Sequence, residues 1–229
     1  MNINVSHNSH PVIAHIENLI MTGQIKMNDR LPPERELACE LNVSRTAVRE
    51  GIRLLEISGI VECRQGSGNY IVPHFDRTLE RVLAMMYALD ELTPSQIREF
   101  RCAVERQALT LAVTNVSDLD RTVLNSCLHG FLNGSTEEEQ ILNDRLLHLQ
   151  LVRMSGNRLV IANYTALNRI IDHSIRDMRK KIYDEDPSYF DQYLAVHRRL
   201  AEAVLAGDLE EAKTALDEHF SFLADNYDT

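Results

Sequence analysis

The feature that most constrains the fold is a change of pattern within the first third of the chain. Residues 31–42, LPPERELACELN, begin near two prolines and carry acidic residues in the first turn, which is typical of a helix N-terminus. After a short break, residues 44–58 repeat apolar side chains at helical spacing and stop before Gly59. Two strand-like runs follow, residues 60–64 and 69–72, joined by the glycine-rich QGSG that suits a tight hairpin. Two short helices, a tight turn between them and a hairpin predict a winged helix-turn-helix.

The rest of the chain has a different pattern, in which helical stretches alternate with brief breakers and no further strand is predicted. The breakers are Thr93-Pro94, Asn115 to Ser117, Asn133-Gly134-Ser135, Ser155-Gly156-Asn157, Asp186-Pro187 and Gly207-Asp208. We therefore predict a mainly α protein. Residues 1–75 form a winged helix-turn-helix with a small β-hairpin, and residues 76–229 form an all-α antiparallel bundle of six or seven helices. The linker, at about residues 72–77, is expected to be short.

Charge and cysteine usage exclude several classes of protein. The net charge is −10, and residues 1–75 are almost balanced, so a uniformly basic surface that coats nucleic acid is excluded. Any DNA contact must come from arginines placed locally. The four cysteines form no CxxC pair, and no apolar run approaches the length of a membrane span. We expect reduced cysteines, no membrane contact and a cytoplasmic location.

The second helix of the predicted helix-turn-helix has a face suited to the major groove of DNA. Val48, Ile52 and Leu55 follow i, i+4, i+7 spacing and share one face, which we expect to be buried. Arg45 and Arg49 fall outside that face, near the start of the helix. This is the part that reads base edges, and the planar fork of arginine can bond O6 and N7 of guanine together. Arginines at this spacing can also form an ordinary solvated face.

Two flanking features favour the DNA-binding interpretation. Arg35 lies near the start of the preceding helix, where it can reach a phosphate. The hairpin tip, residues 65–68, is small enough to enter a minor groove, and Arg64 lies beside it. We therefore expect double-stranded DNA to be the partner of this domain.

The same residues carry a resemblance to a known family. The stretch LPPERELACELNVSRTAVREGIRLLEISGIVECRQGSGNYIV resembles nearly end to end the winged-helix domain of the GntR superfamily of bacterial transcription regulators. In that family the arginines of these motifs contact the operator, and the wing-tip glycine approaches the minor groove. The resemblance implies these DNA-binding residues: Arg35, Ser44, Arg45, Thr46, Arg49 and Gly66. It also implies a homodimer on a short pseudo-palindromic operator, because operator symmetry mirrors protein symmetry.

The helical half contains four potential metal ligands. Asp144 and His148 are four residues apart, so they project from one helix face and can bind the same ion. His197 and His219 lie at similar distances before and after the Gly207-Asp208 turn, so an antiparallel hairpin places them at the same height. Both align with apolar residues of their own helices. A single inward histidine is more often a hydrogen-bonded core residue, but four ligands from three helices favour a metal site.

Three imidazoles and one carboxylate suit a divalent ion with open coordination positions, with zinc favoured and nickel, manganese or iron as alternatives. Residues 78–229 resemble the FCD effector domain of the FadR-type GntR regulators, whose metal-binding members carry a D-x3-H element and two later histidines. The resemblance implies that Asp144, His148, His197 and His219 bind the metal. It also implies that a small organic acid is held there by its carboxylate. Acyl-CoA-sensing members of the family lack this ligand set.

A second group of residues is a candidate for effector binding. Arg101 and Glu105 form an F-R-x-x-x-E element near the start of the domain. Arg101 can clamp the carboxylate of an effector through a bidentate ion pair, or the two residues can form a simple i, i+4 pair on the helix surface. Asn163, Tyr164 and His173 lie on one predicted helix and are further candidates to line the cavity.

These features predict a bacterial DNA-binding transcription regulator, expected to act as a repressor, whose operator binding responds to a metal-held organic acid. The alternatives are a metal sensor, in which the ion is itself the signal, and a purely structural metal site. An enzyme is a further alternative, because a bound ion can activate water. No HExxH element, nucleophile elbow or obvious general base accompanies the ligands, so we predict that the protein is not an enzyme.

Overall fold

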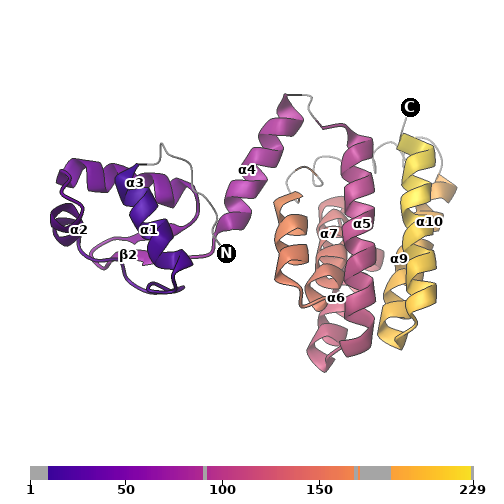
Figure 1. The fold of residues 1–229 in the computed structure, drawn as a ribbon. Helices are drawn as coiled ribbons and strands as arrows, with labels where there is room; N and C mark the ends of the chain where they lie inside the picture. The colour runs from indigo at the N-terminus through magenta and orange to yellow at the C-terminus, as the bar shows by residue number, and fades with distance from the viewer. Residues whose placement is uncertain (1–9, 90–91, 168–169, 171–186, 228–229) are drawn as a thin grey trace. The chain divides into compact units, whose positions relative to one another are not determined.

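The computed structural model describes residues 10–89, 92–167, 170 and 187–227. The chain divides into two compact units, residues 1–79 and 80–229, and each is described by itself. The division falls inside helix α4, Phe75–Ala88 (Figure 1). The mainly helical fold with one small hairpin, which the sequence predicted, is confirmed.

The first unit has the element order of a winged helix-turn-helix. Its elements before α4 are α1 (Pro11–Met21), α2 (Glu34–Glu40), α3 (Arg45–Ile57), β1 (Val61–Arg64) and β2 (Gly68–Ile71). The two strands are antiparallel, with Val61 opposite Ile71 and Arg64 opposite Gly68. Gly66 and Gly68 at the tip have φ of +72° and +119°, which L side chains rarely adopt.

A few residues set the boundaries of α2 and α3. Asn42 follows α2 with φ of 52°, a left-handed conformation that ends a helix. Ser44 caps α3, because its side chain accepts a hydrogen bond from the backbone N–H of Ala47. After α3, Gly59 has φ of +72°, and a Cβ there would lie 2.3 Å from the carbonyl oxygen of His74. Only glycine therefore fits at position 59.

The core of this unit lies between its helices and the hairpin. The predicted inward face of α3 is buried, with Val48, Ile52 and Leu55 each at most 4 % exposed. They pack in one cluster with residues of the other elements, namely Val12, Ile16, Leu31, Leu37, Ala38, Val61 and Ile71. Burial of this stripe leaves the opposite face of α3 in solvent, and so fixes which of its side chains a ligand can reach.

The second unit is built from long helices. The elements after α4 are α5 (Pro94–Ala112), the 3₁₀ helix η1 (Val113–Asn115), α6 (Asp118–Asn133), α7 (Glu137–Met154), a helical segment at residues 158–167, α9 (Pro187–Ala206) and α10 (Leu209–Tyr227). Thr93, Ser117 and Thr136 cap α5, α6 and α7 through their side-chain oxygens. Thr93 and Ser117 belong to predicted breakers, and Thr136 directly follows one. Gly207, with φ of +79°, makes the turn between α9 and α10.

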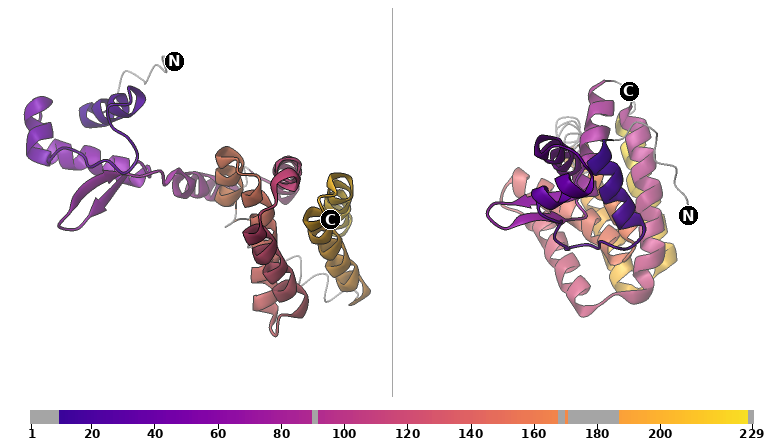
Figure 2. Two further views of the ribbon diagram at one scale, coloured as in Figure 1. Left: turned by 90° about the horizontal axis from the view of Figure 1, so that it is seen from below. Right: turned by 60° about the vertical axis from the view of Figure 1, so that its left-hand side comes forward.

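Long-range packing brings five of these helices around one core. α7 packs against α5 and α6, and α10 packs against α9 and α5 (Figures 1 and 2). Large side chains that are almost completely buried between them include Leu109, Phe131, Leu147, Tyr164 and Tyr193. The middle turns of α5, α7, α9 and α10 therefore face one another, and their polar residues are enclosed.

Two details differ from the sequence-based expectation. α2 begins only at Glu34, because Pro33 has the extended backbone of an N-cap with ψ of 144°. α4 begins at Phe75, so residues expected to link the two halves already belong to a helix. No strand follows the hairpin in the described residues. Among the described helices, none combines the length and apolar character needed to cross a bilayer.

Candidate nucleic-acid interface and candidate metal centre

The outer face of α3 carries the side chains that the sequence predicts to read DNA. Arg45, Thr46 and Arg49 are exposed and lie outside the buried stripe, in the first turns of the helix. Ser44 lies at the N-cap, where its oxygen already accepts a hydrogen bond from Ala47. Its hydroxyl hydrogen can still be donated to a phosphate oxygen. Arg35 is exposed in the first turn of α2.

Arg49 is held by a neighbouring helix. Its Nε donates to Oε2 of Glu34 at 2.7 Å, which joins α3 to the start of α2. The side chain of Arg49 remains 64 % exposed. Since Nε is used by Glu34, the two terminal nitrogens remain available to a ligand. These form the fork that can bond a guanine.

The wing tip is open. Gly66 is exposed, and no atom lies within 4 Å of the position that a Cβ would take there. Arg64 at the base of the tip lies over the ring of Tyr70, with Cζ 4.5 Å from the ring centroid, and its Nε donates to Glu62 at 2.6 Å. The wing therefore presents backbone at its tip and a charged side chain along its flank.

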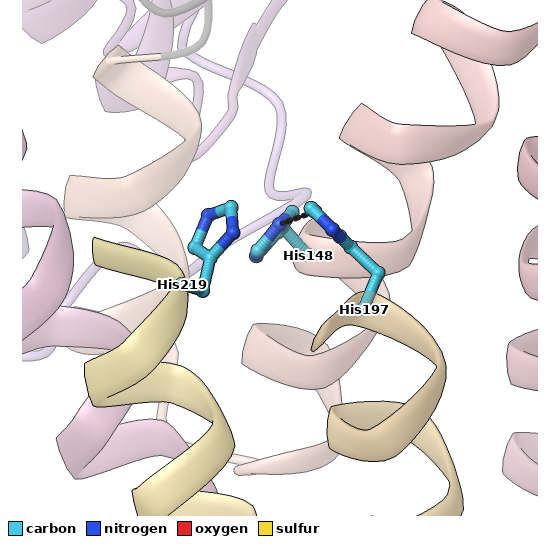
Figure 3. Close-up of side chains that lie close together, drawn as sticks. All are labelled: His148, His197 and His219. Atoms are coloured by element: carbon cyan, nitrogen blue, oxygen red, sulfur yellow. Dashed lines mark hydrogen bonds between the residues drawn. The ribbon is translucent and has the colours of Figure 1, made fainter. Parts of the chain in front are cut away.

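The second candidate site is a buried cluster in the helical unit. His148 comes from α7, His197 from α9 and His219 from α10, and Figure 3 shows their three rings turned toward one another. Asp144 lies one turn before His148 on α7. All four side chains are at most 2 % exposed. The helical hairpin α9–α10 does place His197 and His219 at the same height, and their rings are 4.4 Å apart.

Three atoms of this cluster are spaced like the ligands of one small ion. His148 Nε2 lies 3.2 Å from His197 Nε2 and 3.5 Å from Asp144 Oδ1. His197 Nε2 lies 3.3 Å from the same Asp144 oxygen. Ligands on a tetrahedral ion with bonds of about 2.0–2.1 Å are separated by about 3.4 Å. The three distances between these atoms therefore match the separation between ligands on a tetrahedral ion.

The opposite side of each of these groups is already bonded. His148 Nδ1 lies 2.6 Å from Oε2 of Glu105, and His197 Nδ1 lies 2.7 Å from the backbone oxygen of Tyr193. The hydroxyl of Tyr193 donates to Asp144 Oδ2. Carboxylate and carbonyl oxygens only accept, so both Nδ1 atoms carry the hydrogen of the neutral ring. With the hydrogen of each neutral ring on Nδ1, both Nε2 atoms present a lone pair toward Asp144 Oδ1, which suits the binding of a cation.

His219 completes the cluster differently. Its ring lies 4.9 Å from that of His148, and one nitrogen of each of the three histidines lies within 4.8 Å of the others. Neither nitrogen of His219 has a hydrogen-bond partner, and nor does Asp144 Oδ1, within the part of the chain that the structure describes. Buried polar atoms are rarely left unpaired. Orphaned acceptors that converge on one point fit a bound cation, so the residues present suit a divalent metal.

Burial and local charge reinforce this donor set. Burial lowers the pKa of His148, against the opposing effect of Glu105, and lowers that of His219 well below its ordinary value. Burial would raise the pKa of Asp144, but the neighbouring His197 and His148 outweigh it and hold that pKa well below its usual range. Burial would likewise raise the pKa of Glu105, but His148 and Arg101 lower it to about 2. The carboxylates are therefore charged at neutral pH.

Arg101 lies beside this cluster and is buried. Its Nε donates to Oε1 of Glu105 at 2.7 Å, and only 7 % of its side chain is exposed. The guanidinium lies 5.5 Å from the ring centroid of Phe220. The i, i+4 pair considered from the sequence does form, but inside the domain and not on the helix surface. Arg101 is thus linked through Glu105 to His148.

The three other residues that were candidates to line the effector cavity lie in different environments. Tyr164 is 1 % exposed, and burial together with the nearby Glu105 raises its pKa well above the ordinary value, against the opposing effect of Arg101. Asn163 donates to the carbonyl oxygen of Leu159 in its own helix at 2.8 Å. His173 lies outside the described residues.

Two residues of the cluster were not assigned to it from the sequence. Glu105 was considered only as a partner of Arg101, and Tyr193 was not singled out. The sequence holds one signal for Tyr193, which precedes His197 by one helical turn, as Asp144 precedes His148. No comparable signal links Glu105 to His148, because they belong to different helices.

A winged helix followed by a helical unit with an enclosed polar cluster defines a two-domain DNA-binding regulator. Residues 8–71 match the model of the gntR family of bacterial regulatory proteins, and residues 96–222 match that of the FCD domain. The chain belongs to the GntR family of bacterial transcription regulators, in the group that carries an FCD domain.

Relatives with assigned roles are transcription regulators. The chain is 26% identical over 221 residues to the putative L-lactate dehydrogenase operon regulatory protein of Escherichia coli K12, covering 94% of this chain and 84% of the relative. It is 27% identical over 219 residues to the Glc operon transcriptional activator of the same organism, covering 91% and 84%. It is 26% identical over 210 residues to the HTH-type transcriptional regulator LutR of Bacillus subtilis 168, covering 90% and 95%. These names bear out the prediction that the protein is a regulator and not an enzyme.

A solved structure has the same fold. The Streptococcus agalactiae GntR protein matches with a TM-score of 0.68 and 24% identity, and the match covers 93% of this chain and 97% of that one. At this level of identity the likeness speaks for the fold alone.

Proposed function

We propose that this regulator binds a divalent metal ion through Asp144, His148, His197 and His219, and a small organic acid beside it, and that the acid changes its affinity for an operator. The observation that carries the proposal is the convergence of Asp144 Oδ1 with Nε2 of His148 and of His197, which lie 3.2–3.5 Å from one another. A buried arrangement of this kind is unfavourable without a cation. Zinc is the ion we favour, because imidazole and carboxylate ligands suit it, and an expanded coordination shell leaves a position open beside the four protein ligands.

The role of the ion is to supply positive charge and open coordination positions for an anionic ligand. The protein residues hold four ligand atoms and exclude water from them, since all four side chains are buried. Arg101 supplies a second positive charge nearby, and its terminal nitrogens suit a carboxylate. A relative is named for regulation of an L-lactate dehydrogenase operon, and lactate is a small 2-hydroxy acid. This supports hydroxy acids as the effector class to be tested first.

On the DNA side, we propose that Arg45, Thr46 and Arg49 read the major groove. Arg35 and Ser44 bind phosphates, and the Gly66 tip approaches the minor groove. Two copies of the chain on a pseudo-palindromic operator would double the number of bases read. We further propose that the protein acts in the cytoplasm, as a repressor.

Metal content and effector response are tested on the purified full chain. Elemental analysis should find about one divalent ion per chain, and a thermal-shift screen of the metal-loaded protein should identify stabilising hydroxy, sugar or dicarboxylic acids. The same acid should then alter an operator mobility shift. Protein that holds no divalent ion, and that added zinc, nickel or manganese does not stabilise, would contradict the metal proposal.

The same experiments separate the alternatives. If a chelator alone changes operator binding and no acid does, the ion is the signal. If a chelator lowers stability without changing operator binding, and no acid has an effect, the site is purely structural.

A further inference from the structure

We propose that Glu105 and Tyr193 are positioning residues of the metal centre, which determine the atoms that His148 and Asp144 present to the ion. This inference rests on the proposed metal site and adds two residues that do not touch the ion. Glu105 belongs to α5 and Tyr193 to α9, and both are at most 2 % exposed. Each contacts a ligand on the side away from the point where the ligands converge.

Glu105 controls His148 from a position where it also accepts hydrogen bonds from Arg101 and Tyr164. Its Oε1 accepts from Arg101 Nε at 2.7 Å, and its Oε2 lies 2.6 Å from His148 Nδ1. A guanidinium only donates, so it always requires an acceptor. With both carboxylate oxygens accepting, the hydrogen of His148 stays on Nδ1, and the lone pair of Nε2 is directed to the ion.

An amide in place of this carboxylate would move the hydrogen of His148 from Nδ1 to Nε2. In Glu105→Gln the single carbonyl oxygen is required by Arg101, so the amide nitrogen must face His148 Nδ1. That nitrogen only donates, and His148 would have to accept through Nδ1 and carry its hydrogen on Nε2. The lone pair that faces the ion would then be lost without any change to a ligand residue.

Tyr193 controls two ligands from one position on α9. Its hydroxyl donates to Asp144 Oδ2, which leaves Oδ1 directed toward the histidines. Its backbone oxygen accepts from His197 Nδ1 at 2.7 Å. Tyr193→Phe removes only the first of these contacts. Asp144 would then be free to rotate, while His197 would keep its orientation.

The state of His148 can be measured without any metal. Long-range ¹H–¹⁵N NMR spectra of the metal-free full chain distinguish a ring protonated at Nδ1 from one protonated at Nε2. We expect Nδ1–H in the wild type and Nε2–H in Glu105→Gln. In a second variant, Arg101→Met with Glu105→Gln, the amide oxygen is released to accept from His148, so Nδ1–H should return. Nδ1–H that persists in Glu105→Gln would overturn the assignment of Glu105.

The zinc affinity of each variant supplies the second test. Zinc affinity is measured by competition with a chelator. Glu105→Gln and Tyr193→Phe should each bind zinc about 10–100-fold more weakly than the wild type. The variant that combines Arg101→Met with Glu105→Gln should recover part of the affinity that Glu105→Gln loses. The matched control is Gln150→Met, which removes a buried polar side chain of α7 that bonds Asp120 instead of the cluster. Its zinc affinity should be unchanged.

The two readouts keep this inference separate from the proposed function. If the wild type binds no zinc, the metal site fails, while the spectra of the metal-free protein still decide the role of Glu105. If the wild type binds zinc and both variants bind it equally well, the positioning roles are wrong and the metal site stands. Circular dichroism of each variant checks that the helical fold is retained.

Discussion

We expect Arg45 and Arg49 to contact bases, and Arg35 to contact a phosphate. Arg45 and Arg49 are both exposed near the start of α3, and Nε of Arg49 is bonded to Glu34. We predict that Arg45→Ala or Arg49→Ala costs about 1–3 kcal/mol of specific operator binding and relaxes base preference, because a bidentate guanine contact is lost. Fluorescence anisotropy on operator and base-substituted duplexes measures this. Arg198→Ala, which removes an exposed arginine of α9, controls for the loss of one positive charge. If Arg45→Ala and Arg49→Ala bind the operator as well as Arg198→Ala does, base reading by α3 is excluded.

Arg35→Ala should behave differently. Arg35 is exposed at the start of α2, and its predicted partner is a phosphate. Loss of one phosphate contact weakens binding to all sequences similarly and reduces the slope of log affinity against log salt by about one unit. Binding titrations over a series of salt concentrations test this. A loss confined to one operator sequence would assign base reading to Arg35 instead.

The buried histidines predict how the stability of the metal-free protein depends on pH. Burial lowers the pKa of His148 and His219 in the folded state, while in the unfolded chain both have a pKa near 6.5. As pH falls below about 6.5, the unfolded chain takes up protons that the folded protein excludes, so stability decreases toward acid. Each histidine contributes a slope of at most about 1.4 kcal/mol per pH unit. Melting temperatures are measured between pH 8 and pH 5 in the presence of a chelator. The melting temperature of the wild type should fall as the pH decreases, and that of His219→Leu should fall less steeply.

At the scale of elements, the candidate ion would join α7, α9 and α10. An ion bound by three helices binds the folded state far better than the unfolded chain, so it stabilises by mass action. We predict that zinc at about 100 times its Kd adds about 2.7 kcal/mol to the free energy of unfolding. His197→Ala or Asp144→Ala should lose this increase and the response to effector, while operator binding persists.

The matched control for this experiment is His129→Ala, which removes an exposed histidine of α6. Differential scanning calorimetry with and without zinc gives the comparison. Equal stabilisation of the wild type and His197→Ala would show that zinc binds elsewhere.

The elements themselves were largely predictable from local sequence. Ser44 and Gly59 mark the ends of α3, and the spacing of Val48, Ile52 and Leu55 gave its buried face, because capping and periodicity act within a few residues. The alignment of His197 with His219 also followed from sequence, since one short turn joins their helices.

Contacts between distant helices were not predictable in the same way. Glu105 meets His148 only because α5 packs against α7, and no local pattern encodes that pairing. The burial of the Arg101–Glu105 pair has the same origin, since an i, i+4 pair looks alike on a surface and in a core. Local sequence identified candidate ligands, and tertiary packing determined which groups orient them.

For the molecule as a whole, we predict a homodimer. One α3 reaches too few base pairs for specificity in a genome, and two-fold symmetry doubles the number that is read. Sedimentation velocity at micromolar concentration should give twice the chain mass of 26.2 kDa, and one dimer should occupy one pseudo-palindrome. A monomer that occupies a single half-site would contradict this prediction.

The distribution of the candidate ligands along the chain has a consequence for folding kinetics. Two helical turns of α7, the middle of α9 and the middle of α10 must all be docked before His148, His197 and His219 meet. Contacts between segments so far apart form late, because closing long loops costs entropy that only the finished structure offsets. An ion at this position would therefore not nucleate the bundle. It would leave the folding rate nearly unchanged and slow unfolding, so that the metal-loaded protein would be distinguished by its lifetime in the folded state.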